Sequence, residues 1–96
     1  MLHEDKRRFM RMMVDAQAQL TILDSNTKLT GTCRDISATG LSIITQDTIE
    51  IDTMLNVFIK SHTESIPDLN AETKVVRASQ EDDGTNLIGL EILNFN

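Results

Sequence analysis

The feature that most restricts the fold is an alternation of apolar and polar side chains that recurs between turns along most of the chain. In QAQLTILD (residues 17–24), Ala18, Leu20 and Ile22 alternate with polar residues. This two-residue period is typical of a half-buried β-strand. The same alternation returns in MLNVFIKS, residues 54–61. We therefore expect a protein built from strands.

Four further segments read as strands, namely residues 29–34, 41–45, 70–79 and 86–93. Turn-forming clusters separate neighbouring strands, and the last cluster contains the hairpin pair Asp83-Gly84. Residues 46–53 read as a polar crossover and residues 62–68 as a loop with the only proline. Six short strands with regular turns predict an all-β antiparallel barrel or sandwich, and a closed barrel has no open sheet edges.

The composition indicates a cytoplasmic domain. Ninety-six residues make one domain, and a single cysteine rules out an intrachain disulfide. The chain carries no signal peptide, and its longest apolar runs are far too short to cross a bilayer. We expect no membrane insertion.

The charge is divided unevenly along the chain. Residues 1–13 carry four basic and two acidic side chains, a balance of +2, whereas the rest carries five basic and thirteen acidic, a balance of −8. We predict a flexible basic N-terminal arm over residues 1–14 and a barrel domain over residues 15–96. The formal net charge of −6 and the absence of Trp and Tyr argue against nucleic-acid binding.

The sequence offers little for catalysis. Neither His3 nor His62 has an evident partner, and Cys33 lies in a predicted strand, where a small buried side chain is the simplest interpretation. No spacing typical of metal ligands occurs. We expect no enzymatic activity, no metal and no cofactor.

Two short motifs remain. Arg7-Arg8-Phe9-Met10-Arg11 is an R-x-x-x-R run, and DISATG, residues 35–40, is a D-x-S-x-x-G run. In this pair of motifs, and in the final IGLEIL (residues 88–93), the sequence resembles the PilZ domain family. The resemblance extends over nearly the whole chain and implies a six-stranded PilZ-like barrel that binds cyclic di-GMP.

The resemblance implies that the arginines hold this ligand. Arginine pairs bidentately with phosphate oxygens and with the O6/N7 edge of guanine. Arg7 and Arg11 are the expected contacts, and Arg8 adds charge and can stack or pair. Arg7 and Arg11 are four residues apart, so their two guanidinium groups can converge on one ligand whether the arm is helical or extended.

Each remaining candidate has a functional and a structural interpretation. Asp35 can accept hydrogen bonds from guanine or steady an arginine, and Ser37 can donate to a phosphate, but both can also simply cap a turn. Gly40 can supply a positive φ or allow a base to approach the backbone. Arg77 can stack on a guanine or pair with a carboxylate on the surface.

The predicted function is that of a cyclic di-GMP receptor or adaptor. Ligand binding is expected to change the position of the N-terminal arm and so to recruit an unidentified protein effector. Many family members continue into a C-terminal helix, whereas this sequence ends at Asn96. We therefore expect a stand-alone domain with no long C-terminal helix. The alternative is a protein-interaction domain of the same fold that needs no ligand.

Overall fold

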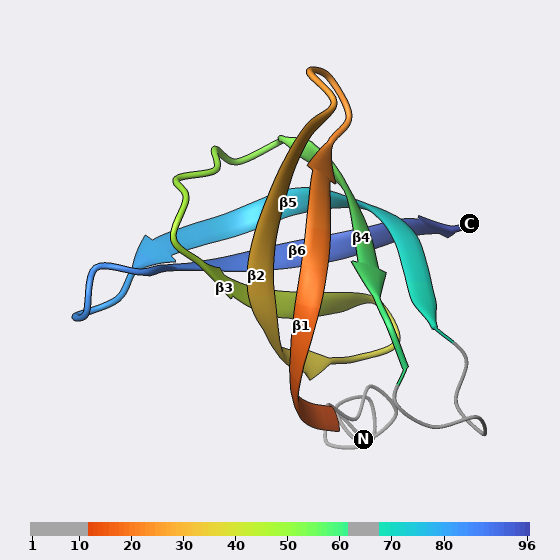
Figure 1. The fold of residues 1–96 in the computed structure, drawn as a ribbon, viewed down its shortest axis with the longest axis horizontal. Helices are drawn as coiled ribbons and strands as arrows, with labels where there is room; N and C mark the ends of the chain where they lie inside the picture. Colours follow the sequence, from red (N-terminus) through yellow and green to blue (C-terminus); the bar gives the residue numbers. More distant parts are fainter. Residues whose placement is uncertain (1–11, 62–67) are drawn as a thin grey trace, which may run out of the picture.

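The computed structural model describes the backbone of residues 12–61 and 68–96 as six strands joined by turns, with no helix in these ranges (Figure 1). The strands are β1 (Met12–Ile22), β2 (Thr27–Ile36), β3 (Gly40–Thr45), β4 (Met54–Ile59), β5 (Leu69–Gln80) and β6 (Asn86–Phe95). All six predicted strands are therefore confirmed. The first begins at Met12 rather than at residue 17, because its early residues pair with the end of β2.

The strands form a closed barrel in the order β1-β2-β3-β6-β5-β4, in which β1 also pairs with β4. Every neighbouring pair is antiparallel. The barrel prediction is confirmed, and a sandwich is not formed. Closure of the sheet leaves none of the strands as an open edge.

The alternating side chains meet inside the barrel. In β4, Leu55, Val57 and Ile59 are buried, as the sequence pattern predicts, and Leu41 and Ile43 of β3 are buried with them. Polar groups within this core are paired. The Thr73 hydroxyl is fully buried and donates to the Leu55 carbonyl at 3.0 Å. The interior is therefore apolar, and its buried hydroxyl is hydrogen-bonded.

The crossover from β3 to β4, residues 46–53, is not purely polar as expected. Ile49 is only 4% exposed and packs into the hydrophobic core. The crossover is also fixed to β5, because the Asp52 amide donates to the Val75 carbonyl at 2.8 Å and the Val75 amide donates to the Thr53 carbonyl at 2.9 Å. A buried isoleucine and two backbone hydrogen bonds therefore hold this segment against the barrel.

Candidate functional site

The D-x-S-x-x-G motif forms the tight connection between β2 and β3. The Ser37 amide donates to the Gly40 carbonyl at 2.8 Å, and the Ser37 hydroxyl donates to the same oxygen at 3.2 Å. The Ile92 amide of β6 donates to the Thr39 carbonyl at 2.9 Å. The turn-capping interpretation of Ser37 is therefore confirmed, and the loop is fastened to the neighbouring strand.

Gly40 serves the fold in a way that differs from the expected one. Its φ is not among the positive values, so the prediction of a positive φ is wrong. A Cβ at this position would instead overlap the Leu90 carbonyl oxygen of β6. Glycine is required because the two backbones approach so closely. The approach of a flat base to Gly40 stays a prediction.

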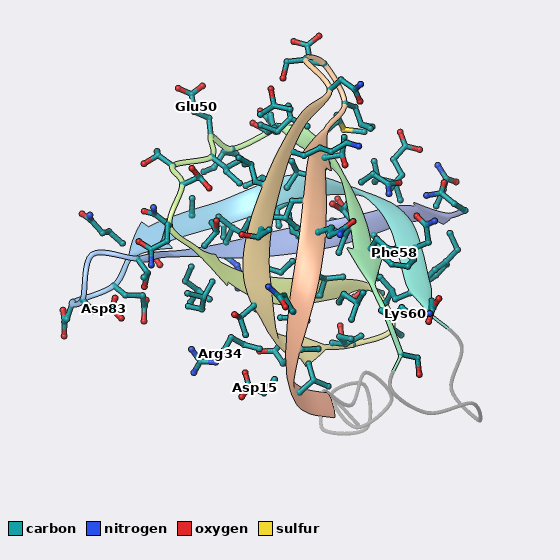
Figure 2. All side chains as sticks on the ribbon, in the orientation of Figure 1. Asp15, Arg34, Glu50, Phe58, Lys60 and Asp83 are labelled. Carbon is teal, nitrogen blue, oxygen red and sulfur yellow. The ribbon has the colours of Figure 1, made fainter. Side chains whose placement is uncertain are left out.

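Asp35 reaches the outer face of the barrel through a β-bulge at Arg34. Cys33 pairs with Ile43 and Asp35 pairs with Ser42, so Arg34 is an extra residue in β2. A bulge of this kind re-aims the side chains that follow it. Arg34 projects outward from the barrel (Figure 2), and Asp35, half-buried, follows it on the same face instead of turning inward.

A second β-bulge, at Val76, redirects the side chain of Arg77. Val75 pairs with Leu90 and Arg77 pairs with Gly89, so Val76 is the extra residue in β5. Val75 is fully buried, whereas Val76 and Arg77 are both exposed. Arg77 is thereby placed on the outer face of the sheet.

The two bulges bring distant parts of the sequence into one row across four strands. Asp35 of β2 is paired with Ser42 of β3, Ser42 with Gly89 of β6, and Gly89 with Arg77 of β5. Directly paired residues share a face of the sheet. The row therefore joins the D-x-S-x-x-G motif to Arg77 over the outer surface.

Gly89 gives the arginine its position in this row. A Cβ on Gly89 would lie 2.9 Å from Arg77 Nε, 2.9 Å from Nη2 and 3.3 Å from Cζ. Because both nitrogens are nearer to this point than Cζ is, the Nε–Nη2 edge of the guanidinium faces Gly89. Among the described residues, an ion pair joins Lys60 to Asp68 at 3.7 Å, and none joins Arg77 to a carboxylate.

Two adjoining hollows open on this face, and Val76 and Arg77 line both. The first, of about 380 Å³, is lined also by Ser37, Thr39 and Gly40 of the motif loop and by Glu91. The second, of about 450 Å³, extends from Ser42 and Gly89 to Ile51 on the crossover. The structure thus brings Ser37, Gly40 and Arg77 together in one hollow, whereas Asp35 lies beside it in the row.

A larger hollow, of about 740 Å³, lies between the β1–β2 turn and the crossover. Four carboxylate residues line it, namely Asp24, Glu50, Asp52 and Glu72. Glu50 projects from the crossover, far from Arg34 and the end of β2 (Figure 2). A site with this charge would repel a phosphate, so size alone does not identify the place where an anion binds.

Cys33 is unsuited to nucleophilic chemistry. Its side chain is fully buried, which confirms the structural interpretation, and Sγ donates weakly to the Asp35 carbonyl at 3.5 Å. Burial, assisted by the charge of Asp35, raises the pKa of the thiol to about 11. In the part of the chain that the structure describes, no three His, Cys, Asp or Glu residues gather in a way that could hold a metal ion.

Arg7, Arg8 and Arg11 lie outside the described residues, so their place relative to the hollows stays a prediction. Sequence reasoning missed Ser42, Gly89 and Glu91. The alternation around Leu41 and Ile43 pointed Ser42 outward, and IGLEIL contains both Gly89 and Glu91, but no local signal shows that they neighbour the motif loop.

Comparison with known proteins identifies the family. The sequence profile of the PilZ domain matches residues 5–96. The chain belongs to the PilZ domain family. This match covers both motifs and the whole barrel, so it agrees with the resemblance that the motifs carry. No curated protein sequence matches the chain closely enough to be called a relative.

Solved structures share this PilZ fold at low sequence identity. The Bacillus subtilis inhibitor of motility, MotI/DgrA, superposes with a TM-score of 0.75 at 17% identity over 94% of this chain and 44% of its own. The PilZ domain of YcgR from Escherichia coli, determined with c-di-GMP, gives 0.70 at 15% identity over 93% of this chain and 79% of its own. YcgR in complex with c-di-GMP gives 0.74 at 15% identity over 93% of this chain and 38% of its own.

This PilZ chain therefore spans less than half the length of MotI/DgrA and of the longer YcgR structure. At such identities the likeness establishes the fold. Within the described ranges, no helix has the length and apolar character that a membrane crossing needs.

Proposed function

We propose that this PilZ domain is a receptor for cyclic di-GMP, which binds over the outer face of the barrel beside the β2–β3 loop. One observation supports this most strongly: Ser37 and Gly40 of the motif line the same hollow as Arg77, although nearly forty residues separate them in the sequence. Membership of the PilZ family and the structures of YcgR with c-di-GMP support the choice of this ligand.

The groups around the hollow suit a ligand with two phosphates and two guanines. The Ser37 hydroxyl would exchange its 3.2 Å bond to Gly40 for a bond to a phosphate oxygen. The carboxylate of Asp35 would accept from the N–H groups of guanine or steady an arginine. Arg77 would stack on a guanine. These roles involve binding alone, and we infer a receptor and not an enzyme.

The arginines of the R-x-x-x-R run are the proposed grips on the phosphates. Met12 pairs with Ile36, directly before the motif loop. Arg11 precedes Met12 in the chain, and Arg7 lies five residues before it. Even a fully extended chain keeps Arg7 within about 17 Å of Met12. Arg7, Arg8 and Arg11 are therefore tethered to the strand that pairs with the end of β2, and we propose that they reach the ligand from there, since their charge is opposite to that of the ligand.

Calorimetric titration with cyclic di-GMP, with GTP and cyclic AMP as controls, tests the proposal. Saturable binding at micromolar concentration or tighter is expected. Arg11→Ala should weaken it by roughly 1.5–3 kcal/mol, as for a hydrogen bond to a charged group. Lys28→Ala, which removes an exposed cation opposite Thr21, is the matched control and should bind normally. A flat titration of folded protein would refute the receptor and leave the ligand-independent interaction domain.

We propose further that the bound ligand changes the position of the N-terminal arm and that the new surface engages a protein effector. The measurement is an amide NMR spectrum of residues 1–11 with and without saturating cyclic di-GMP. Large shifts and lower mobility in the saturated state are expected. If binding is present but these amides do not respond, the arm is not the switch.

A further inference from the structure

We propose that the hollow of about 740 Å³ between the β1–β2 turn and the crossover receives the N-terminal segment of a second copy of this chain. The docking segment is KRRFMR, residues 6–11. The docking itself does not depend on the proposed receptor function. Its regulation rests on that function, because arginines that hold cyclic di-GMP are not free to enter the hollow, so ligand binding should release the second copy.

The hollow has an apolar lining that no other part of the described structure covers fully. This lining comes from the end of β1, the crossover and the start of β4, and consists of Ile22, Leu23, Ile49 and Met54. Leu23 is 43% exposed although it is large and apolar. Exposed apolar groups around a hollow of this size are typical of a surface that binds another molecule.

Backbone hydrogen bonds hold the segments around the hollow in place. The Leu23 amide donates to the Met54 carbonyl at 3.0 Å, which joins the β1–β2 turn to β4. The Thr53 amide donates to the Glu50 carbonyl at 3.2 Å, which closes a turn at the end of the crossover. The hollow is therefore formed before a partner arrives, and its walls need little further ordering on binding.

Carboxylate side chains surround the apolar lining. They come from the β1–β2 turn, the crossover and β5, and are Asp24, Glu50, Asp52 and Glu72. No three of the described acidic residues gather closely enough to hold a metal ion. No basic side chain of residues 12–61 or 68–96 lines the hollow, and Lys74, although paired with Met54, is not part of its lining. Separated carboxylates around an apolar surface suit a segment in which cations flank apolar side chains.

The N-terminal segment of this chain has the matching chemistry. Residues 6–11 hold four of the nine basic side chains and no acidic one. Phe9 and Met10 lie between these cations in the sequence and would contact the apolar lining. The guanidinium groups on either side would pair with the surrounding carboxylates.

The segment and the hollow of the same molecule are too far apart to meet. β1 begins at Met12 and reaches the hollow at Ile22, at its opposite end (Figure 1). Ten residue steps along a strand span about 33 Å. Arg7 stays within about 17 Å of Met12 even in a fully extended chain. The arginines that occupy the hollow must therefore come from a second copy.

The first test adds a synthetic peptide of residues 1–11 to dilute, methyl-labelled full-length protein without ligand. The methyl signals of Leu23 and Met54 should shift, and raising the salt concentration from about 0.05 to 0.5 M should weaken the response. The signals of Leu93 should stay in place, because Leu93 is 41% exposed but lines none of the three hollows. Unmoved Leu23 and Met54 signals, or an equal response at Leu93, would overturn the docking site.

Sedimentation velocity over a concentration series measures docking between full-length chains. The ligand-free wild type should associate as its concentration rises. Asp24→Lys combined with Glu50→Lys reverses two exposed charges at the hollow and should raise the concentration needed by about tenfold or more. The matched control is Glu81→Lys combined with Asp82→Lys, which makes the same charge change on the β5–β6 turn and should associate normally. A wild type that stays monomeric, or equal association of both double variants, would contradict the proposal.

Adding saturating cyclic di-GMP to the same samples separates the docking from the receptor function. Binding of the ligand with loss of association is the expected result. Binding with unchanged association would show that the two do not compete, and would overturn the regulation. Failure of the folded chain to bind cyclic di-GMP would overturn the receptor and the regulation together, whereas the peptide and the double variants decide the docking without any ligand.

Discussion

Gly40 and Gly89 lie on adjacent strands, and the same substitution at the two positions should have different effects. In Gly40→Ala the new methyl overlaps the Leu90 carbonyl oxygen, which belongs to the β6 backbone. In Gly89→Ala the new methyl meets Arg77 Nε and Nη2 at 2.9 Å, which are atoms at the end of a flexible exposed side chain. Backbone cannot yield without moving the strand, whereas the guanidinium can swing into solvent.

These contacts predict different changes in unfolding free energy for the two substitutions. Overpacking against fixed atoms costs about 1–3 kcal/mol. Replacing glycine in a strand returns about 0.5–1 kcal/mol by restricting the unfolded chain. Because the overlapped atom at Gly40 belongs to the backbone, the upper part of that overpacking range, about 2–3 kcal/mol, applies there. After the return, Gly40→Ala should lose about 1–2.5 kcal/mol of unfolding free energy, or roughly 4–20 °C in melting temperature for a domain of this size. Gly89→Ala should stay within about 0.5 kcal/mol of wild type.

Urea unfolding followed by far-UV circular dichroism measures both variants, since the chain has no Trp or Tyr for fluorescence. The urea concentration at the unfolding midpoint should fall for Gly40→Ala, while the dependence of the unfolding free energy on urea concentration is unchanged. For Gly89→Ala the midpoint should stay at the wild-type value. Equal stability of Gly40→Ala and wild type would refute the close approach of β3 and β6. A loss in Gly89→Ala as large as in Gly40→Ala would refute the idea that only the arginine side chain is displaced.

Three further predictions concern single groups. Thr73→Val removes the buried hydroxyl that donates to Leu55, and should lower the unfolding free energy by about 1–2 kcal/mol in the same urea assay. The pKa of Cys33 is raised from 9.0 to about 11, so the fold favours the neutral thiol, and stability should decline as the pH rises from about 9 to 11 but not in Cys33→Ala. Hydrogen bonds from the Thr85 hydroxyl and amide lower the pKa of Asp83, and Thr85→Val should raise that pKa in an NMR titration.

Strand positions were predictable from the sequence because their signals are local. The alternation in β4 and the Asp83-Gly84 turn each specify structure within a few residues, and both are confirmed. The burial of Ile49 was not predictable in the same way. Nothing local in the sequence distinguishes Ile51 from Ile49, yet only Ile49 is buried. Its burial depends on the core that the other strands create.

The bulges explain why only part of the candidate site could be predicted. A bulge can be recognised only when the residues of one strand are aligned with those of the strand beside it. A single sequence does not give this alignment, so it does not reveal that Arg34 and Val76 are extra residues. Strict alternation past Cys33 would turn Asp35 inward. The motif identified Asp35 and Ser37 as candidates, but the row that joins them to Gly89 and Arg77 exists only after the barrel closes.

The same geometry decides which substitutions can report on the ligand. The Ser37 hydroxyl donates a hydrogen bond within the β2–β3 loop, and the missing side chain of Gly40 leaves room for the Leu90 carbonyl. Variants at either position therefore disturb the barrel as well as the hollow. A loss of binding in Gly40→Ala would therefore not show that a ligand contacts Gly40. Arg77 is exposed, and its guanidinium rests on Gly89 without an ion pair to a described carboxylate. Arg77→Ala should leave the strand intact, so weakened binding in that variant can be assigned to a lost ligand contact.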